Sequence, residues 1–174
     1  MKHLYLIGGT MGVGKTHTCQ LLKEKLDRSV FLDGDWCWDA HPFQVTEETK
    51  SMVLDNITYL LHNFLRCSAY EHVIFCWVMH EQSIIDTLVD RLRRQGDLDA
   101  AALHCISLVC TPQALEARLR RDVARGARKE EVIVRSIARL PLYQKLHTAL
   151  LDVSDLTPEA AAEAIREGAL HGSM

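Results

Sequence analysis

The chain has 174 residues, of which 48% are hydrophobic and 25% are charged, and these values are typical of one globular domain. The formal net charge of −3 argues against a general nucleic-acid-binding protein, which usually carries a strong basic excess. No apolar run approaches the roughly 20 residues that cross a bilayer, and a chain of this size does not need its six cysteines as a disulfide scaffold. We therefore expect a reduced, cytoplasmic protein with neither a nucleic-acid nor a membrane partner.

Strand-like and helix-like segments alternate along the chain. In chain order they are the strand His3–Ile7, the helix Thr16–Leu26, the strand Val30–Leu32, the helix Thr46–Leu65, the strand Val73–Val78, the helix Ser83–Arg94, the strand Leu103–Val109, a helix that begins at Thr111-Pro112, the strand Ala149–Val153 and a helix that begins at Thr157-Pro158. This alternation predicts an α/β fold, with a five-stranded parallel sheet covered by helices on both faces. Ligands of such sheets bind at the carboxyl ends of the strands, so we seek function in the segments that follow each strand.

The segment after the first strand carries a complete phosphate-binding motif. It matches G-x-x-x-x-G-K-[ST] and consists of Gly9, Thr10, Met11, Gly12, Val13, Gly14, Lys15 and Thr16. The glycines let successive N–H groups point into one concavity, and the following helix presents its positive end there. Lys15 can reach the outer phosphates, and the Thr16 hydroxyl is a ligand for Mg²⁺. The alternative is a glycine-rich turn that binds nothing.

The phosphate-binding loop alone is compatible with a GTPase, an ATPase motor or a small-molecule kinase. Neither Asn56 nor Asn63 is followed by lysine, so the Asn-Lys-x-Asp stretch with which common GTPases read guanine is absent. Three stretches, Gly9–Thr16, Leu32–Asp35 and Arg118–Lys129, resemble the small P-loop kinases. This group contains the gluconate, shikimate and adenylylsulfate kinases, chloramphenicol phosphotransferase and the nucleoside monophosphate kinases. The resemblance spans most of the chain and implies a three-layer P-loop NTPase fold with a small lid and with ATP as the donor.

Two carboxylates follow the second strand, in the sequence Asp33-Gly34-Asp35. In the enzymes that the chain resembles, this acidic pair faces the acceptor hydroxyl and contacts the Mg²⁺ shell. An acceptor hydroxyl needs a proton acceptor within hydrogen-bond reach as phosphoryl transfer proceeds. We assign that catalytic role to Asp35, and we assign binding of the acceptor and of the metal to Asp33. The alternative is an Asx turn, for which this sequence is also suited.

The segment Arg118–Lys129 is rich in arginine, and the resemblance makes it part of the lid that closes over the phosphates. The planar guanidinium group matches the oxygens of a transferred phosphoryl group. Arg118, Arg121 and Arg125 have the spacing of one helix face, and Gly126 is a candidate hinge. We assign catalytic roles to Arg121 and Arg125 and nucleotide binding to Arg118. The alternative is a solvated helix face.

Aromatic and polar residues crowd the segment where the resembling enzymes bind their acceptor. Trp36 and Trp38 can stack on a base or a sugar, and His41 can bind hydroxyls, whereas packing of a tryptophan under the next helix is the alternative. Between Trp36 and Leu65 the only Lys or Arg is Lys50. A monophosphate acceptor normally needs guanidinium groups, so this segment favours a less charged sugar, nucleoside or antibiotic.

The third strand departs from the resembling family. Many relatives place an aspartate at its end to hold a water on Mg²⁺, but this strand carries no carboxylate, which leaves Glu81 or Asp33 for that task. We predict a single domain, residues 1–174, with an acceptor-binding segment at about 36–66 and a lid at about 118–131, as a monomer or homodimer. Its predicted function is transfer of the γ-phosphoryl group of ATP, with Mg²⁺, to a small-molecule hydroxyl. A nucleoside monophosphate kinase and a non-catalytic ATP-binding module are the alternatives.

Overall fold

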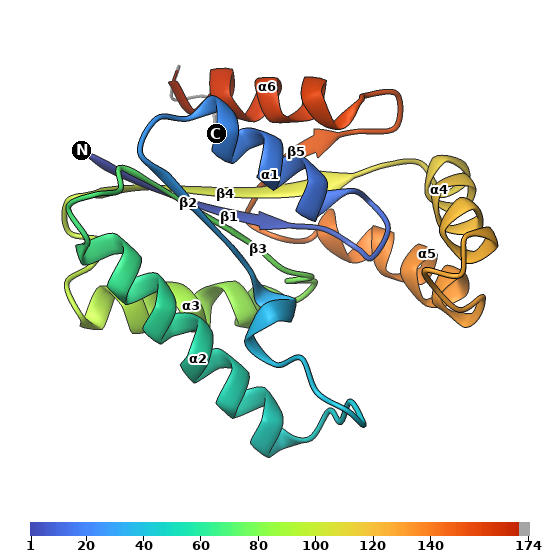
Figure 1. Cartoon of the computed structure of the whole chain (residues 1–174), viewed down its shortest axis with the longest axis horizontal. Coiled ribbons are helices and arrows are strands. Elements are labelled where there is room, and N and C mark those ends of the chain that lie inside the picture. The colour runs from blue at the N-terminus through green and yellow to red at the C-terminus, as the bar shows by residue number, and fades with distance from the viewer. Residues whose placement is uncertain (171–174) are drawn as a thin grey trace.

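The structure is a computed structural model that describes residues 1–170. Its centre is a five-stranded sheet of order β2-β3-β1-β4-β5, in which every neighbouring pair is parallel (Figure 1). The strands are β1 (Lys2–Gly8), β2 (Ser29–Asp33), β3 (His72–Cys76), β4 (Ala101–Val109) and β5 (Ala149–Asp152). The helices are α1 (Lys15–Lys25), the 3₁₀ turn η1 (Gly34–Cys37), α2 (Glu47–Arg66), α3 (Gln82–Arg94), α4 (Pro112–Ala124), α5 (Glu131–Tyr143) and α6 (Pro158–Leu170). The predicted α/β class and five-stranded parallel sheet are confirmed.

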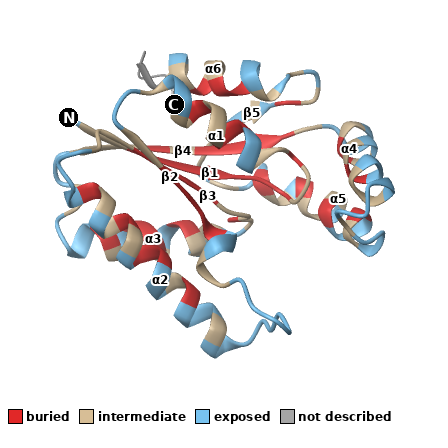
Figure 2. Ribbon diagram, in the orientation of Figure 1, coloured by how far each residue is buried: buried red, intermediate tan, exposed pale blue. Residues whose placement is uncertain are grey.

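Helices cover both faces of the sheet: α1 and α6 lie on one face, and α2 and α3 lie on the other (Figure 1). Alternate residues of one strand point into different cores. Tyr5 and Ile7 pack under α1 and α6, whereas Leu4 and Leu6 pack under α2 and α3. Figure 2 shows the central strands as the most buried part of the molecule. Burial on both faces explains why the strands are continuous apolar runs rather than alternating ones.

The order of the strands places a crevice at one edge of the sheet. All strands run in the same direction, so their carboxyl ends meet at that edge. β3 and β4 flank β1 on opposite sides, so the chain connects to one side after β1 and later crosses to the other. Such a switch in direction opens a crevice at the carboxyl end of the strand concerned, and the loop after β1 lies there.

A helical hairpin of α4 and α5 stands beside this edge (Figure 1). Its apolar seam consists of Leu115, Leu119, Ile133 and Leu140. α5 is absent from the predicted elements, although its apolar residues Ile133, Ile137 and Leu140 keep the period of a helix. Its start and interior lack the usual signals, because Glu130 caps the helix without a side-chain hydrogen bond and Pro141 lies inside it.

The predicted helix starts are confirmed, and two strands end earlier than predicted, β3 by two residues and β5 by one. Thr46 Oγ1 accepts a hydrogen bond from the backbone N–H of Thr49 at the start of α2, and Thr111 caps α4 ahead of Pro112. β3 ends at Cys76 instead of Val78, because its neighbour β2 ends at Asp33, the partner of Cys76, and turns into η1. Within residues 1–170, no helix has the length and apolar character that spanning a membrane requires.

Candidate active site

The loop between β1 and α1 has the backbone of a phosphate-binding cradle. Gly12 and Gly14 have φ angles of 85° and 103°, in the left-handed region that side chains disfavour. Gly12 is also needed for space, because a Cβ there would lie 2.4 Å from Leu119 Cδ2. α1 begins after Gly14 without a side-chain cap, so the first N–H groups of the helix stay available to anion oxygens.

Hydrogen bonds hold this loop against the helical hairpin. The buried hydroxyl of Thr10 donates to the carbonyl oxygen of Ser136 in α5 at 2.8 Å. Lys15 Nζ donates to the carbonyl oxygen of Thr10 at 3.1 Å, so the ammonium folds back over the loop. Burial lowers the pKa of Lys15, and nearby acidic groups, Asp33 and Asp35 among them, oppose that effect. An anion bound in the loop would add to this opposing effect.

The loop forms one wall of a cleft of about 400 Å³. The cleft is lined by Met11, Gly12, Gly14, Lys15, Thr16, His17, Asp33, Asp35, Val78, Arg118, Arg121, Asp122, Arg125 and Arg128. Gly9, Thr10 and Val13 of the predicted motif are buried within the protein and do not line the cleft. The predicted phosphate loop, acidic pair and arginines thus come together in one cleft.

The carboxylate of Asp33, at the end of β2, lies beside the hydroxyl of Thr16. Thr16 Oγ1 donates to Asp33 Oδ2 at 2.6 Å, and the backbone N–H of Asp35 donates to Asp33 Oδ1 at 3.0 Å. Mg²⁺ prefers such oxygen ligands and usually takes one or two of them besides phosphate oxygens and water. Thr16 and Asp33 therefore fit the predicted Mg²⁺. Elsewhere in the described residues, no three His, Cys, Asp or Glu side chains form a group that could hold a metal ion.

Asp35 belongs to the 3₁₀ turn η1 and is exposed to the cleft. Desolvation and the neighbouring Asp33 carboxylate raise its pKa, against the opposing effects of Lys15, the indole of Trp77 and Arg128. The indole contact is a hydrogen bond from Trp77 Nε1 to Asp35 Oδ1 at 3.2 Å. An accessible carboxylate with a raised pKa is suited to accept a proton from a bound hydroxyl.

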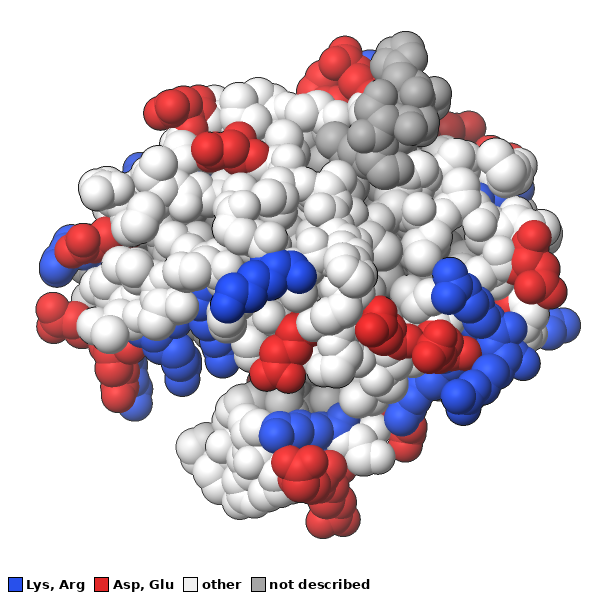
Figure 3. Space-filling view, turned by 180° about the vertical axis from the view of Figure 1, so that it is seen from behind, with Lys and Arg blue, Asp and Glu red and all other residues white. Residues whose placement is uncertain are grey.

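Arginines from the lid segment form the opposite wall. Arg121, near the end of α4, and Arg125, just after it, line the cleft together with Arg128. Arg128 Nε donates to Asp122 Oδ2 at 3.1 Å, and its charge acts to lower the pKa of Asp35 across the cleft. Figure 3 shows Lys and Arg side chains gathered along one side of a hollow. This wall therefore offers several positive charges to an anion in the cleft.

Arg118 differs from the other lid arginines because the protein backbone uses its donors. Its guanidinium donates to the carbonyl oxygens of Val13 at 3.2 Å, of Val153, and of Ser154 at 3.3 Å. Arg118 therefore joins α4 to the phosphate loop and to the segment after β5. The part of the side chain that lines the cleft remains accessible to a nucleotide.

The aromatic residues after the acidic pair pack against one another and against the sheet. Trp36 is 55% exposed and meets Phe31 edge-on, with ring centroids 5.2 Å apart. Trp38 lies between Phe43 and Trp77, with centroid distances of 4.8 and 6.0 Å. Trp38 therefore shows the packing against neighbouring side chains that was the alternative to stacking on an acceptor.

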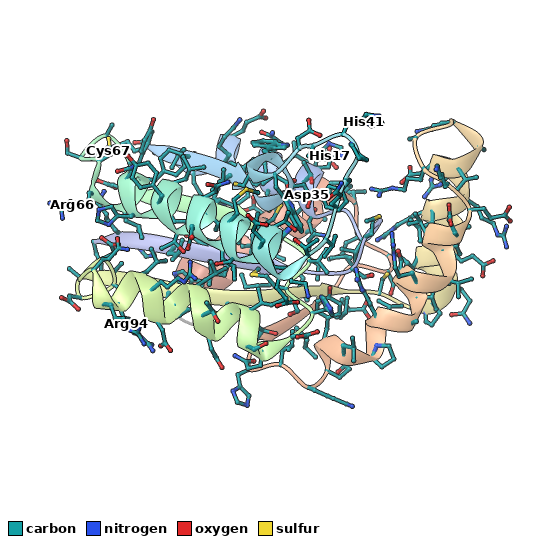
Figure 4. The ribbon with its side chains drawn as sticks, turned by 90° about the horizontal axis from the view of Figure 1, so that it is seen from below. His17, Asp35, His41, Arg66, Cys67 and Arg94 are labelled. Atoms are coloured by element: carbon teal, nitrogen blue, oxygen red, sulfur yellow. The ribbon has the colours of Figure 1, made fainter. Side chains whose placement is uncertain are left out.

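Of the four predicted acceptor-binding residues, Asp33 lines the cleft, whereas Trp36, Trp38 and His41 do not. Figure 4 shows His41 at the same end as His17 and Asp35, far from Arg66 and Arg94 at the opposite end. His41 is exposed, and neither it nor the two tryptophans of this segment line the cleft. Contact of these three residues with an acceptor remains a prediction.

Comparison with known protein families finds one family model that matches most of the chain. The family model described as AAA domain matches residues 6–137. The chain belongs to the AAA domain family. No curated protein sequence matches the chain.

Solved structures with the same fold as this AAA domain include several small kinases. The tunicamycin resistance protein of Deinococcus radiodurans is 20% identical with a TM-score of 0.73, over 99% of this chain and 96% of its own. A gluconokinase from Sinorhizobium meliloti 1021 is 16% identical with a TM-score of 0.64, over 99% and 98%. A shikimate kinase from Acinetobacter baumannii, solved with shikimate, is 20% identical with a TM-score of 0.63, over 100% and 96%. These likenesses confirm the predicted resemblance to small P-loop kinases at the level of the fold.

Sequence reasoning missed part of the lining of the cleft in this AAA domain. His17 directly follows Thr16, and that adjacency is a signal that could have identified it. Arg128 and Asp122 lie in the predicted lid, but their pairing depends on how the chain turns after α4. Of the two candidates for the carboxylate missing from the third strand, Asp33 lies beside Thr16, whereas Glu81 does not line the cleft.

Proposed function

We propose that this protein transfers the γ-phosphoryl group of ATP, bound with Mg²⁺, to a hydroxyl group of a small-molecule acceptor. The observation that carries the proposal is the meeting, in one cleft, of the phosphate loop, the Thr16–Asp33 pair, the Asp35 carboxylate and the lid arginines. The names of a gluconokinase and a shikimate kinase among the similar structures support a small-molecule acceptor.

The phosphates of ATP bind at the start of α1 in this proposal. The free N–H groups of the helix and the Lys15 ammonium hold the phosphate oxygens, whose negative charge keeps Lys15 protonated. Thr16 and Asp33 would hold the Mg²⁺ ion, which would supply positive charge beside the phosphate oxygens.

The acceptor hydroxyl then approaches between Asp35 and the γ-phosphate. Its oxygen forms a bond to the γ-phosphorus while the bond from that phosphorus to the β–γ bridging oxygen breaks, and ADP leaves. Asp35 accepts the hydroxyl proton, a role that its raised pKa favours. Arg121, Arg125 and Arg128 stabilise the negative charge on the transferred group.

The proposed acceptor is a sugar, a nucleoside or an antibiotic with little negative charge. Lys50, the only Lys or Arg between Trp36 and Leu65, is already paired, since its Nζ lies 2.9 Å from Glu47 Oε1. The segment therefore offers a phosphorylated acceptor few free cations. The exposed indole of Trp36 and the exposed imidazole of His41 instead suit a ring with hydroxyl groups.

The direct test is ADP release from ATP·Mg²⁺ in the presence of sugars, nucleosides, nucleoside monophosphates and antibiotics. We expect a weakly charged acceptor to stimulate ADP release, and Lys15→Ala to abolish it while thermal unfolding stays unchanged. Lys23→Ala, on the same helix but away from the cleft, is the matched control and should keep full activity. Stimulation by monophosphates would identify a nucleoside monophosphate kinase. ATP binding without product across the whole panel would identify a non-catalytic module.

A further inference from the structure

The indole of Trp77 contacts Asp35 from a distant part of the chain. Trp77 follows β3, and its Nε1 donates to Asp35 Oδ1 at 3.2 Å although 42 positions separate the two residues. Lys15 and Arg128 act on the same carboxylate through their charges. An N–H that donates to one oxygen limits rotation of the carboxylate, so the second oxygen can be directed at a substrate.

Trp77 is itself held in place. Its backbone N–H donates to the carbonyl oxygen of Ile7 at 3.2 Å, and the next carbonyl, that of Val78, accepts the hydroxyl of Tyr143 at 2.7 Å. The ring lies directly against Gly34, where a Cβ would be 2.6 Å from Trp77 Cγ. Glycine is therefore needed between the two aspartates for space, because the indole covers the turn that carries Asp35.

The same ring also contacts the predicted acceptor-binding segment. Trp38 meets Trp77 edge-on, with ring centroids 6.0 Å apart and planes at 77°. Phe43 continues this aromatic group on the other side of Trp38. A ligand that packs against this group would press on the side chain that donates to Asp35.

We propose that Trp77 is a positioning residue for Asp35. Its indole N–H sets the orientation of the carboxylate, and its ring joins that carboxylate to the aromatic side chains beside the acceptor. The inference rests on the proposed function of Asp35 as the proton acceptor. Because Trp77 acts through Asp35 and does not line the cleft, its loss should lower kcat and leave KM for ATP unchanged.

The contact can be tested without any turnover, in ¹H–¹⁵N NMR spectra of the full chain. The chain contains three tryptophans, and Trp77→Phe assigns the Trp77 indole signal by its loss. Asp35→Ala removes the acceptor, so the Trp77 indole proton should move upfield and exchange faster with water. The backbone N–H signal of Tyr70, away from the cleft, serves as the internal control. An unmoved Trp77 signal would overturn the proposal.

Kinetics test the positioning role. Trp77→Phe keeps an aromatic ring and removes the N–H, and we expect kcat to fall roughly tenfold, the effect of one hydrogen bond to a charged group. In Asp35→Ala, measured at high enzyme concentration, the same substitution should change the residual kcat by less than about twofold. Equal losses in both backgrounds would show that Trp77 only supports the fold. A wild type that phosphorylates no acceptor would contradict the proposed function, and the indole signal would still decide whether Trp77 holds Asp35.

Gly34→Ala tests the same role from the other side of the contact. The added methyl group overlaps the indole and should displace it, so kcat should fall by a factor similar to that of Trp77→Phe although no polar atom is removed. Tyr70→Phe, whose ring packs on Phe64 away from the cleft, is the matched control and should keep wild-type kcat. Thermal unfolding verifies that each variant is folded. Wild-type kcat in both Gly34→Ala and Trp77→Phe would contradict the proposal.

Discussion

The glycines on the two sides of the cleft are required for different reasons. Gly12 combines a left-handed backbone with a position where a Cβ would lie 2.4 Å from Leu119 Cδ2. Gly126, in the turn after α4, has a φ of 73°, but nothing lies within 4 Å of a Cβ built on it. The two positions therefore separate the effect of backbone conformation from the effect of space.

This difference gives a paired prediction. Gly126→Ala should lower the free energy of unfolding by about 1–2 kcal/mol, the cost of a left-handed alanine, and should change ATP affinity less than Gly12→Ala does, because Gly126 does not line the cleft. Gly12→Ala should lower the free energy of unfolding further, because Leu119 must move, and should weaken ATP binding on the order of tenfold. Chemical denaturation and calorimetric titration measure the two effects. Equal ATP affinities in the two variants would contradict the assignment of Gly12 to the phosphate cradle.

The Thr16–Asp33 pair yields a prediction on metal dependence. Asp33→Asn removes the negative charge near the proposed Mg²⁺ and leaves one side-chain oxygen, so only one of the donors, the Thr16 hydroxyl or the Asp35 N–H, keeps its acceptor. We expect the Mg²⁺ concentration for half-maximal activity to rise on the order of tenfold, with a small loss of thermal stability. Asp27→Asn, at an exposed position away from the cleft, is the control. An unchanged Mg²⁺ requirement would assign the metal to other ligands.

At the scale of the elements, the sequence predicted what local patterns determine. The strand cores, the start of α4 at Thr111-Pro112 and the phosphate loop each depend on neighbouring residues, and all are found where predicted. α5 was not predicted, because its start has no side-chain cap and Pro141 interrupts its apolar period. The spacing of the lid arginines predicted that Arg118 lies at the cleft. Its hydrogen bonds to Val13 and to the segment after β5 could not be predicted, because they depend on the packing of three elements. The contact of Trp77 with Asp35 is of the same kind, since no local pattern joins residues 42 positions apart.

The bonds of Arg118 predict a structural role beside any role in nucleotide binding. Arg118→Ala removes a half-buried guanidinium that joins α4, the phosphate loop and the end of β5. It should lower the free energy of unfolding by about 1–3 kcal/mol. Arg120→Ala, two positions away, removes only exposed pairs with Glu116 and Glu130 and should cost less than about 0.5 kcal/mol. Urea unfolding without nucleotide compares the two, and equal losses would contradict the role of Arg118.

At the scale of the whole molecule, the amino and carboxyl ends of the strands carry different kinds of side chain. The carboxyl ends of the strands form the cleft, whereas aromatic and imidazole rings pack together near the amino ends. Tyr5 stacks on His104 at a centroid distance of 4.8 Å and contacts His72 Nδ1 through its hydroxyl at 3.2 Å. His3 stacks on His72 at 5.0 Å. Burial in this cluster raises the pKa of Tyr5 to about 12.

This ring cluster makes the stability of the fold depend on pH. Burial lowers the pKa values of His3 and His72 below 6.5, with Glu71 opposing the shift in both. In the unfolded chain both groups titrate near 6.5, so between that pH and the lowered values the unfolded state binds more protons. The free energy of unfolding is therefore greatest above about pH 6.5 and decreases as the pH falls toward the folded-state pKa values. Urea unfolding between about pH 8 and pH 5 should show this decrease, and a His3→Gln/His72→Gln variant should show a smaller one, because glutamine binds no proton. Parallel curves for the variant and the wild type would assign the acid sensitivity to other groups.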